Sequence, residues 1–92
     1  MIKRSRLFGG KTRVTFCLPE GEPGGTVSVV GCFNGWEPGR HELVSRRNGT
    51  RSVSLPLAPG RYHFRYLATG GVWLDDEGAD AVIEGLGGRL DL

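Results

Sequence analysis

The chain alternates between short runs of apolar and polar residues and is interrupted throughout by 16 glycines and five prolines. Nowhere do apolar residues recur at i, i+3, i+4 and i+7 for three turns, the spacing of an amphipathic helix. Short alternating segments bounded by glycine and proline are typical of β-strands. The sequence therefore predicts an all-β fold.

Seven segments carry the strand pattern. They are Lys11–Leu18, Thr26–Phe33, His41–Arg46, Arg51–Leu57, Arg61–Ala68, Val72–Asp75 and Arg89–Leu92. About seven short strands at this spacing predict an immunoglobulin-like β-sandwich, and a small barrel is the alternative. A chain of 92 residues is long enough for one domain with a modest core.

The segment Thr26–Trp36, with the sequence TVSVVGCFNGW, ends in a turn that carries an aromatic residue. Val27, Val29 and Phe33 fall on one face of the expected strand by the period of two. Asn34-Gly35 then provides a tight turn that releases the chain from the sheet. Trp36 is thus either an exposed binding platform or a plug over the end of the core.

The two cysteines are not expected to form a disulfide. If Arg13–Leu18 and Thr26–Phe33 form a hairpin with Leu18 opposite Val27, Cys17 and Cys32 are about 13 Å apart along the strands. Free thiols are typical of a reducing compartment. Because the N-terminus lacks the apolar run of a signal peptide and no segment could span a bilayer, we expect a cytoplasmic protein with no membrane partner.

Charge is distributed unevenly along the chain. Residues 1–73 carry eleven Lys and Arg against four Asp and Glu, whereas residues 74–92 carry one against six. Residues 1–10 are predicted to be a flexible basic tail ahead of a single domain at residues 11–92. Lys3, Arg4, Arg6 and Lys11 form either a phosphate-contacting arm or simply a solvated tail. Since aromatic and basic residues are not interleaved as in nucleic-acid-binding domains, no nucleic-acid partner is expected.

No catalytic arrangement stands out. The only cluster of carboxylates is Asp75, Asp76, Glu77 and Asp80, and its first two members would point to opposite faces of a strand, away from each other. Glycoside cleavage needs two carboxylates held roughly 5 to 10 Å apart. The cysteines and histidines lack the close spacing of a zinc site. We therefore expect a protein that is not an enzyme and that uses no metal or cofactor.

A surface constellation remains. Trp36 and Trp73 each follow a turn, and His63 and Arg65 project from the outer face of the strand that leads to Trp73. An indole stacks on the apolar C–H face of a glucose ring, while Arg, Asn and His side chains hydrogen-bond the sugar hydroxyls. Asn34, His63 and Arg65 are thus candidate polar ligands, although His63 and Arg65 are equally typical of a plain solvated sheet face.

Three blocks of the sequence, TVSVVGCFNGW, GRYHFRYLA and GGVWLDD, occur in this order within about Val14–Asp80. Together they resemble the starch- and glycogen-binding early-set domain found in isoamylases, glycogen branching enzymes and the β subunit of AMP-activated protein kinase. The resemblance implies an immunoglobulin-like sandwich with Trp36 and Trp73 as stacking platforms. Arg65 stands where the family often has a lysine, and Leu86 matches a leucine that inserts into the curve of the sugar chain. The asparagine that follows this leucine in the family is absent, and Arg89 is a candidate replacement.

We therefore expect non-catalytic binding of an α-glucan such as glycogen, starch or a maltooligosaccharide. The alternative is a domain that keeps the fold but has lost sugar binding, and that acts as a packing or protein-interaction module of a glycan-metabolising enzyme. The expected partners are accordingly an α-glucan and such an enzyme, and the domain itself is expected to be a monomer.

Overall fold

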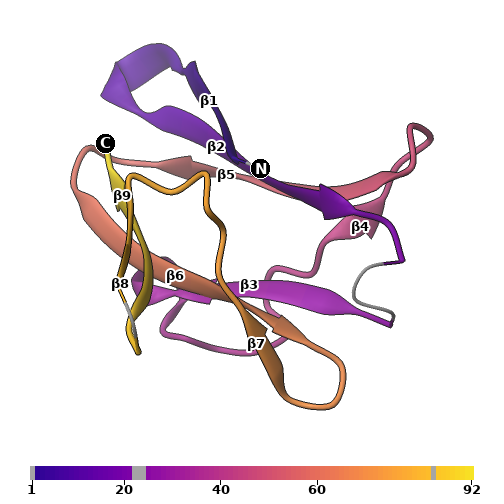
Figure 1. Cartoon of the computed structure of the whole chain (residues 1–92). Helices are drawn as coiled ribbons and strands as arrows, with labels where there is room; N and C mark the ends of the chain where they lie inside the picture. The colour runs from indigo at the N-terminus through magenta and orange to yellow at the C-terminus, as the bar shows by residue number, and fades with distance from the viewer. Residues whose placement is uncertain (1, 22–24, 84) are drawn as a thin grey trace.

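The computed structural model describes residues 2–21, 25–83 and 85–92, and it consists of two antiparallel sheets packed face to face (Figure 1). The first sheet has the order β1-β2-β5-β4, and the second has the order β3-β6-β9-β8 with β7 also paired to β6. The strands of the first sheet are β1 Ile2–Arg6, β2 Thr12–Pro19, β4 Val44–Ser45 and β5 Thr50–Leu57. Those of the second are β3 Val27–Gly31, β6 Arg61–Ala68, β7 Val72–Leu74, β8 Ala81–Ile83 and β9 Gly87–Asp91.

The strand order is that of an immunoglobulin constant-type sandwich. Such a domain places strands A, B, E and D in one sheet and strands C, F and G in the other. Here β1, β2, β5 and β4 take the first four places, and β3, β6 and β9 take the other three. The remaining strands, β7 and β8, lie in the connection from β6 to β9. The all-β sandwich is confirmed, and the structure is not a closed barrel.

The core is built from the inward-facing positions of the longest strands. Val14, Phe16, Phe64 and Tyr66 are fully buried, as the alternation in β2 and β6 predicts. Phe16 lies at the centre, with its ring centroid 5.0 Å from that of Phe64 and 6.3 Å from that of Tyr66. The Tyr66 hydroxyl donates a hydrogen bond of 2.7 Å to the buried Asp76 carboxylate. This bond attaches the segment after β7 to the core.

The predicted hairpin between Arg13–Leu18 and Thr26–Phe33 is wrong. β2 pairs with β1 and β5, whereas β3 pairs with β6 in the other sheet. Both strands have one apolar face, and this pattern is the same whether two consecutive strands are neighbours in one sheet or cross between layers. The expected absence of a Cys17–Cys32 disulfide is confirmed for a different reason, because the two residues belong to opposite layers.

The flexible basic tail predicted at residues 1–10 is also wrong where the structure describes it. Ile2–Arg6 form β1, which pairs with β2 in the register Ile2 to Phe16 and Arg6 to Thr12. Ile2 packs against the core, and the 3-10 turn η1 Phe8–Gly10 joins β1 to β2. A strand with a single apolar residue among charged neighbours carries a weak sequence signal, and its stability comes from the ladder that β2 offers.

Asn48-Gly49, between two strand segments of the sequence, predicts a two-residue type I′ hairpin, and the observed turn differs from it. The β4–β5 hairpin closes with a hydrogen bond from the Arg46 N–H to the Thr50 carbonyl, and only Gly49 in its loop has positive φ. It is thus a three-residue loop ending in a left-handed glycine rather than a two-residue type I′ turn. Among the described residues, no helix is long and apolar enough to cross a membrane.

Candidate functional site

The outer face of the second sheet gathers most of the side chains that the sequence singles out. In β6, Phe64 and Tyr66 point into the core, so His63 and Arg65 point outward by the period of two. Trp73 in β7 lies directly opposite Leu67 of β6, which places the indole on the same outer face. Together with Trp36 and Leu86, these residues define what we call the tryptophan face: Trp36, His63, Arg65, Trp73 and Leu86.

Trp36 is held on a rigid turn. β3 ends at Gly31 and continues as the 3-10 turn η2 Cys32–Asn34, after which Gly35 adopts a left-handed conformation with φ of 67°. Trp36 follows with φ of 59°, the only positive φ among the described residues other than glycine. Its N–H donates to the Gly31 carbonyl over 2.9 Å. Such a backbone conformation persists only where the surroundings enforce it, and here it leaves the Trp36 side chain 40% exposed. The Trp36 indole therefore lies at the surface and is not a buried plug over the end of the core.

Asn34 enforces this turn from inside. Its side chain accepts a 3.0 Å hydrogen bond from the Gly31 N–H and donates one of 3.1 Å to the Val29 carbonyl. A further contact of 2.9 Å joins its amide nitrogen to Nδ1 of His41. The side chain is buried with its polar atoms all engaged. The prediction of Asn34 as a direct sugar ligand is therefore wrong, because an Asn that precedes a turn can hydrogen-bond its own backbone.

Three predicted residues surround one shallow hollow of about 210 Å³. Trp36, His63 and Leu86 line it, with Cys32 as the fourth wall. Leu86 is 59% exposed, so its side chain stands at the rim, and the Cys32 sulfur accepts a 3.4 Å hydrogen bond from the His63 N–H. Residues from three distant parts of the chain therefore meet at this hollow.

Arg65 and Trp73 form the second part of the face. The guanidinium carbon of Arg65 lies 5.4 Å from the centroid of the Trp73 ring, in cation–π geometry. Nε of Arg65 pairs with the Asp75 carboxylate at 3.0 Å, which leaves the terminal amino groups of the guanidinium for other acceptors. The Trp73 side chain is 44% exposed. The Arg65 guanidinium thus lies against the Trp73 indole and covers part of it.

Gly87 in β9 makes room for this arrangement. A Cβ atom at Gly87 would lie 2.3 Å from Cγ of Arg65 and 2.7 Å from the Phe64 carbonyl oxygen. The stem of Arg65 therefore crosses the sheet directly over a glycine.

Two residues that adjoin the tryptophan face were not identified from the sequence. Asp75 orients Arg65, and Cys32 forms a wall of the hollow. The alternation of β7 contained a signal for Asp75, because it lies two residues after Trp73 and so shares its face. Arg89, the candidate replacement for the missing asparagine, lies opposite His63 and forms an ion pair with Asp91 at 3.2 Å. It is on the same outer face but does not line the hollow.

The carboxylates nearby are committed to structural contacts. Burial by itself raises the pKa of Asp76, but hydrogen bonds from the Tyr66 hydroxyl and the Gly78 N–H outweigh it and lower that pKa below its usual value. Burial, with the hydrogen bond to Asp76, holds the pKa of Tyr66 far above its ordinary value. Among the described residues, no three His, Cys, Asp or Glu side chains are grouped to hold a metal ion.

Comparison with known proteins gives short partial matches. No family model matches the chain. It is 43% identical over 44 residues to the 1,4-alpha-glucan branching enzyme GlgB of Rhodopseudomonas palustris (strain HaA2), which covers 48% of this chain and 6% of the relative. It is 41% identical over 54 residues to Protein FLOURY ENDOSPERM 6, chloroplastic, of Oryza sativa subsp. japonica, covering 59% of this chain and 10% of the relative. A third relative, GlgB 2 of Xanthomonas campestris pv. campestris (strain 8004), is 42% identical over 40 residues.

The chain thus spans a tenth or less of the length of these relatives. It is related in sequence to a small part of glucan-branching enzymes.

Proposed function

We propose that this domain binds α-glucans, such as glycogen, starch or maltooligosaccharides, through the tryptophan face and without catalysing a reaction on them. The observation that carries the proposal is the placement of two half-exposed indoles on one sheet face: Trp36, which lines a hollow with His63 and Leu86, and Trp73, which lies opposite Leu67 farther along β6. The relation to glucan-branching enzymes and the resemblance to starch- and glycogen-binding early-set domains both support it.

The chemistry of the face suits a curved chain of glucose units. One glucose ring stacks on Trp36, with the apolar side chain of Leu86 at the rim of the same hollow. A second ring stacks at Trp73, where the terminal amino groups of Arg65 donate to sugar hydroxyls. Because Arg65 and Trp36 are already held by their neighbours, little ordering entropy opposes binding. Two stacks and a few exposed hydrogen bonds still predict weak affinity for a single oligosaccharide, with gain by repetition on a polymer.

The positions of the acids support a binding role. Hydrolysis or transfer at a glycosidic bond uses a pair of carboxylates across a cleft. Asp75 is paired with Arg65, and Asp76 is buried against Tyr66. Neither carboxylate is therefore presented to a sugar on the tryptophan face as an acid or a nucleophile.

The test is a titration of ¹⁵N-labelled protein with maltoheptaose and β-cyclodextrin, followed by amide and indole chemical shifts. We expect shifts at Trp36, His63, Arg65, Trp73 and Leu86, and none with a β-linked cello-oligosaccharide. Because one stacking contact contributes about 1–3 kcal/mol, Trp36→Ala and Trp73→Ala should each weaken binding roughly 5- to 150-fold.

Phe8→Ala is the matched control. Phe8 is a fully exposed aromatic on the 3-10 turn between β1 and β2, in the other sheet, and its removal should leave sugar binding unchanged. An absence of shifts at millimolar maltoheptaose would refute the proposal, as would binding that survives both tryptophan substitutions.

A second candidate function is a packing or interaction module of a glycan-metabolising enzyme. The exposed apolar side chains of Val72, Val82 and Leu86 favour it, since a sugar needs fewer such contacts than a protein surface does. Failure of all sugars to bind, with the fold intact, would favour this function over the first.

A further inference from the structure

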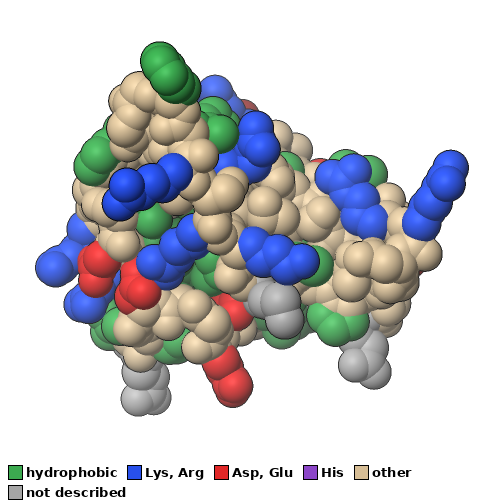
Figure 2. Space-filling model, turned by 90° about the horizontal axis from the view of Figure 1, so that it is seen from above, with side chains coloured by type: hydrophobic (Ala, Val, Ile, Leu, Met, Phe, Trp, Pro, Cys, Tyr) green, Lys and Arg blue, Asp and Glu red, His purple; other side chains and the backbone are tan. Residues whose placement is uncertain are grey.

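The sheet opposite the tryptophan face has a strongly basic surface. Residues 2–20 and 44–60, which form β1, β2, β4, β5 and their turns, contain eight Lys and Arg but only one acid, Glu20. Arg51 is buried and Arg4 pairs with Asp80 at 2.9 Å, so the charge on the outer face comes from the others, among them Lys3 and Arg46. Figure 2 looks down on this sheet and shows basic side chains spread across it with few acidic ones among them. Like-charged groups collected on one face repel each other and attract anions from solution. This face therefore favours a negatively charged ligand.

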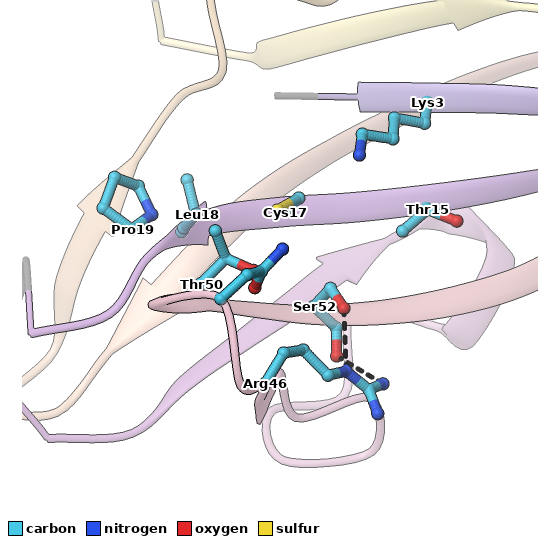
Figure 3. Close-up of a pocket in the computed structure, with 9 residues that line it drawn as sticks. Lys3, Thr15, Cys17, Leu18, Pro19, Arg46, Thr50 and Ser52 are labelled. Carbon is cyan, nitrogen blue, oxygen red and sulfur yellow. Dashed lines mark hydrogen bonds between the residues drawn. The ribbon is translucent and has the colours of Figure 1, made fainter.

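A hollow of about 570 Å³ lies on this face, within the size range of small-molecule sites. It crosses the sheet from Lys3 on β1, over Cys17 on β2 and Ser52 on β5, to Arg46 in the β4–β5 turn (Figure 3). The strand register explains the alignment, because Lys3 is opposite Thr15 and Cys17 is opposite Ser52, so their side chains share the outer face. None of the described residues that line the hollow is acidic.

The hydrogen bonds among the residues that line the hollow occupy their acceptor groups and leave donor groups available to a ligand. Nε and Nη2 of Arg46 donate to the Ser52 hydroxyl oxygen at 3.0 Å and to the Ser52 carbonyl at 3.3 Å, which leaves its Nη1 amino group (Figure 3). The Thr50 hydroxyl donates to the Asn48 side-chain oxygen at 2.6 Å, so the Asn48 amide nitrogen remains a donor. With the Lys3 ammonium, the hollow thus presents two cations and an amide donor.

This donor-rich set needs an acceptor-rich anion. We propose that the hollow binds a phosphorylated sugar, with its phosphate group between Lys3 and Arg46. A phosphate monoester carries close to two negative charges and three acceptor oxygens at neutral pH, and the guanidinium fork of Arg46 matches it in geometry. Leu18 and Pro19 supply an apolar wall for the C–H face of the sugar, and Asn48 supplies a donor for its hydroxyls.

An extended polyanion fits less well. A nucleic acid or an acidic polymer would be bound by cations spread over the whole face together with aromatic side chains, and no aromatic residue among those that the structure describes lines this hollow. The proposal does not rest on glucan binding, since the two sites lie on opposite sheets of the sandwich.

The experiment is a chemical-shift titration of the full chain with glucose 6-phosphate at 150 mM NaCl, beside glucose and inorganic phosphate as separate probes. We expect shifts at the Asn48 side-chain amide, Arg46 Nε and the amides of Cys17 and Ser52. Inorganic phosphate should shift the same resonances with lower affinity, and glucose should shift them least. The Trp36 and Trp73 indole resonances should stay in place, because they report on the other face.

Arg46→Gln should weaken glucose 6-phosphate binding about tenfold or more, since a hydrogen bond to a charged group contributes about 1.5–3 kcal/mol. Arg40→Gln is the matched control: it removes the same charge from an exposed arginine paired with Glu37 outside the basic sheet, and it should leave binding unchanged.

Three results would overturn the proposal. One is an absence of shifts at 20 mM glucose 6-phosphate. Another is equal weakening by Arg40→Gln and Arg46→Gln. The third is a set of small shifts distributed over all the basic residues of the sheet, which would indicate diffuse attraction of any polyanion. Equal affinity for inorganic phosphate and glucose 6-phosphate would overturn the role of the sugar.

Discussion

Asn34→Ala is expected to lower the free energy of unfolding by about 2–6 kcal/mol, because its side chain completes the edge of β3. The Val29 N–H and the Val27 carbonyl are paired with the segment that ends at Leu43. Past this point, the Asn34 amide takes the place of a neighbouring peptide group by donating to the Val29 carbonyl and accepting from the Gly31 N–H.

The magnitude follows from these two buried contacts. Alanine would leave one backbone acceptor and one backbone donor without a partner, and each such group costs about 1–3 kcal/mol. For a domain whose total stability is of the order of 5–15 kcal/mol, this loss is a large fraction. It also frees the turn that holds Trp36 in its left-handed conformation, so glucan binding should weaken together with stability.

The assay is urea denaturation followed by tryptophan fluorescence, with Asn48→Ala as the matched control. Asn48 also precedes a glycine in a turn, but it is exposed, and its side-chain oxygen accepts only a hydroxyl hydrogen bond. Its replacement should cost less than about 1 kcal/mol. Equal costs for the two variants would refute the reasoning. So would an Asn34→Ala variant that keeps full stability but loses sugar binding, because this would make Asn34 a direct ligand after all.

Two further predictions concern stability. The carboxylate of Asp76 has a lowered pKa through the hydrogen bond from Tyr66, so its contribution to stability is present above about pH 4 and is lost as the pH falls through the folded-state pKa. In urea titrations from pH 7 to pH 2.5, the free energy of unfolding should therefore fall less steeply with acid in Asp76→Asn than in the wild type. An equally steep fall in both proteins would contradict this. Gly87→Ala should destabilise the domain more than Gly85→Ala by about 1–3 kcal/mol. Both glycines have positive φ, but only Gly87 lies under the stem of Arg65. Thermal melts in which the two variants lose equal stability would contradict the close packing.

Much of the sandwich follows from local sequence. Alternation in Arg61–Ala68 assigns Phe64 and Tyr66 to the core and Arg65 to the outer face, and the structure agrees. The reason is geometric, since successive side chains of a strand must point to opposite sides whatever the strand pairs with. The turn after Gly31 is local in the same sense, because Gly35 is free to take positive φ.

Which strands pair with one another does not follow from local sequence, and here the sequence-based predictions were wrong. β1 pairs at the edge of the first sheet through contacts between residues far apart in the chain. Contacts of the same kind place β2 and β3 in different layers. Several partners satisfy the same period of two, and only the packing of the whole core selects among them.

For the two candidate sites as well, some features follow from the sequence and others only from the tertiary structure. Sequence by itself determined that this is an all-β chain with Trp36, Trp73, His63 and Arg65 at outward or turn positions. Tertiary structure alone decided that Leu86 meets Trp36 and His63 at one hollow, that Asn34 is internal, and that Lys3 and Arg46 line one hollow on the opposite sheet. A side chain's direction is a property of its own strand, whereas its neighbours across a sheet are set by the fold as a whole.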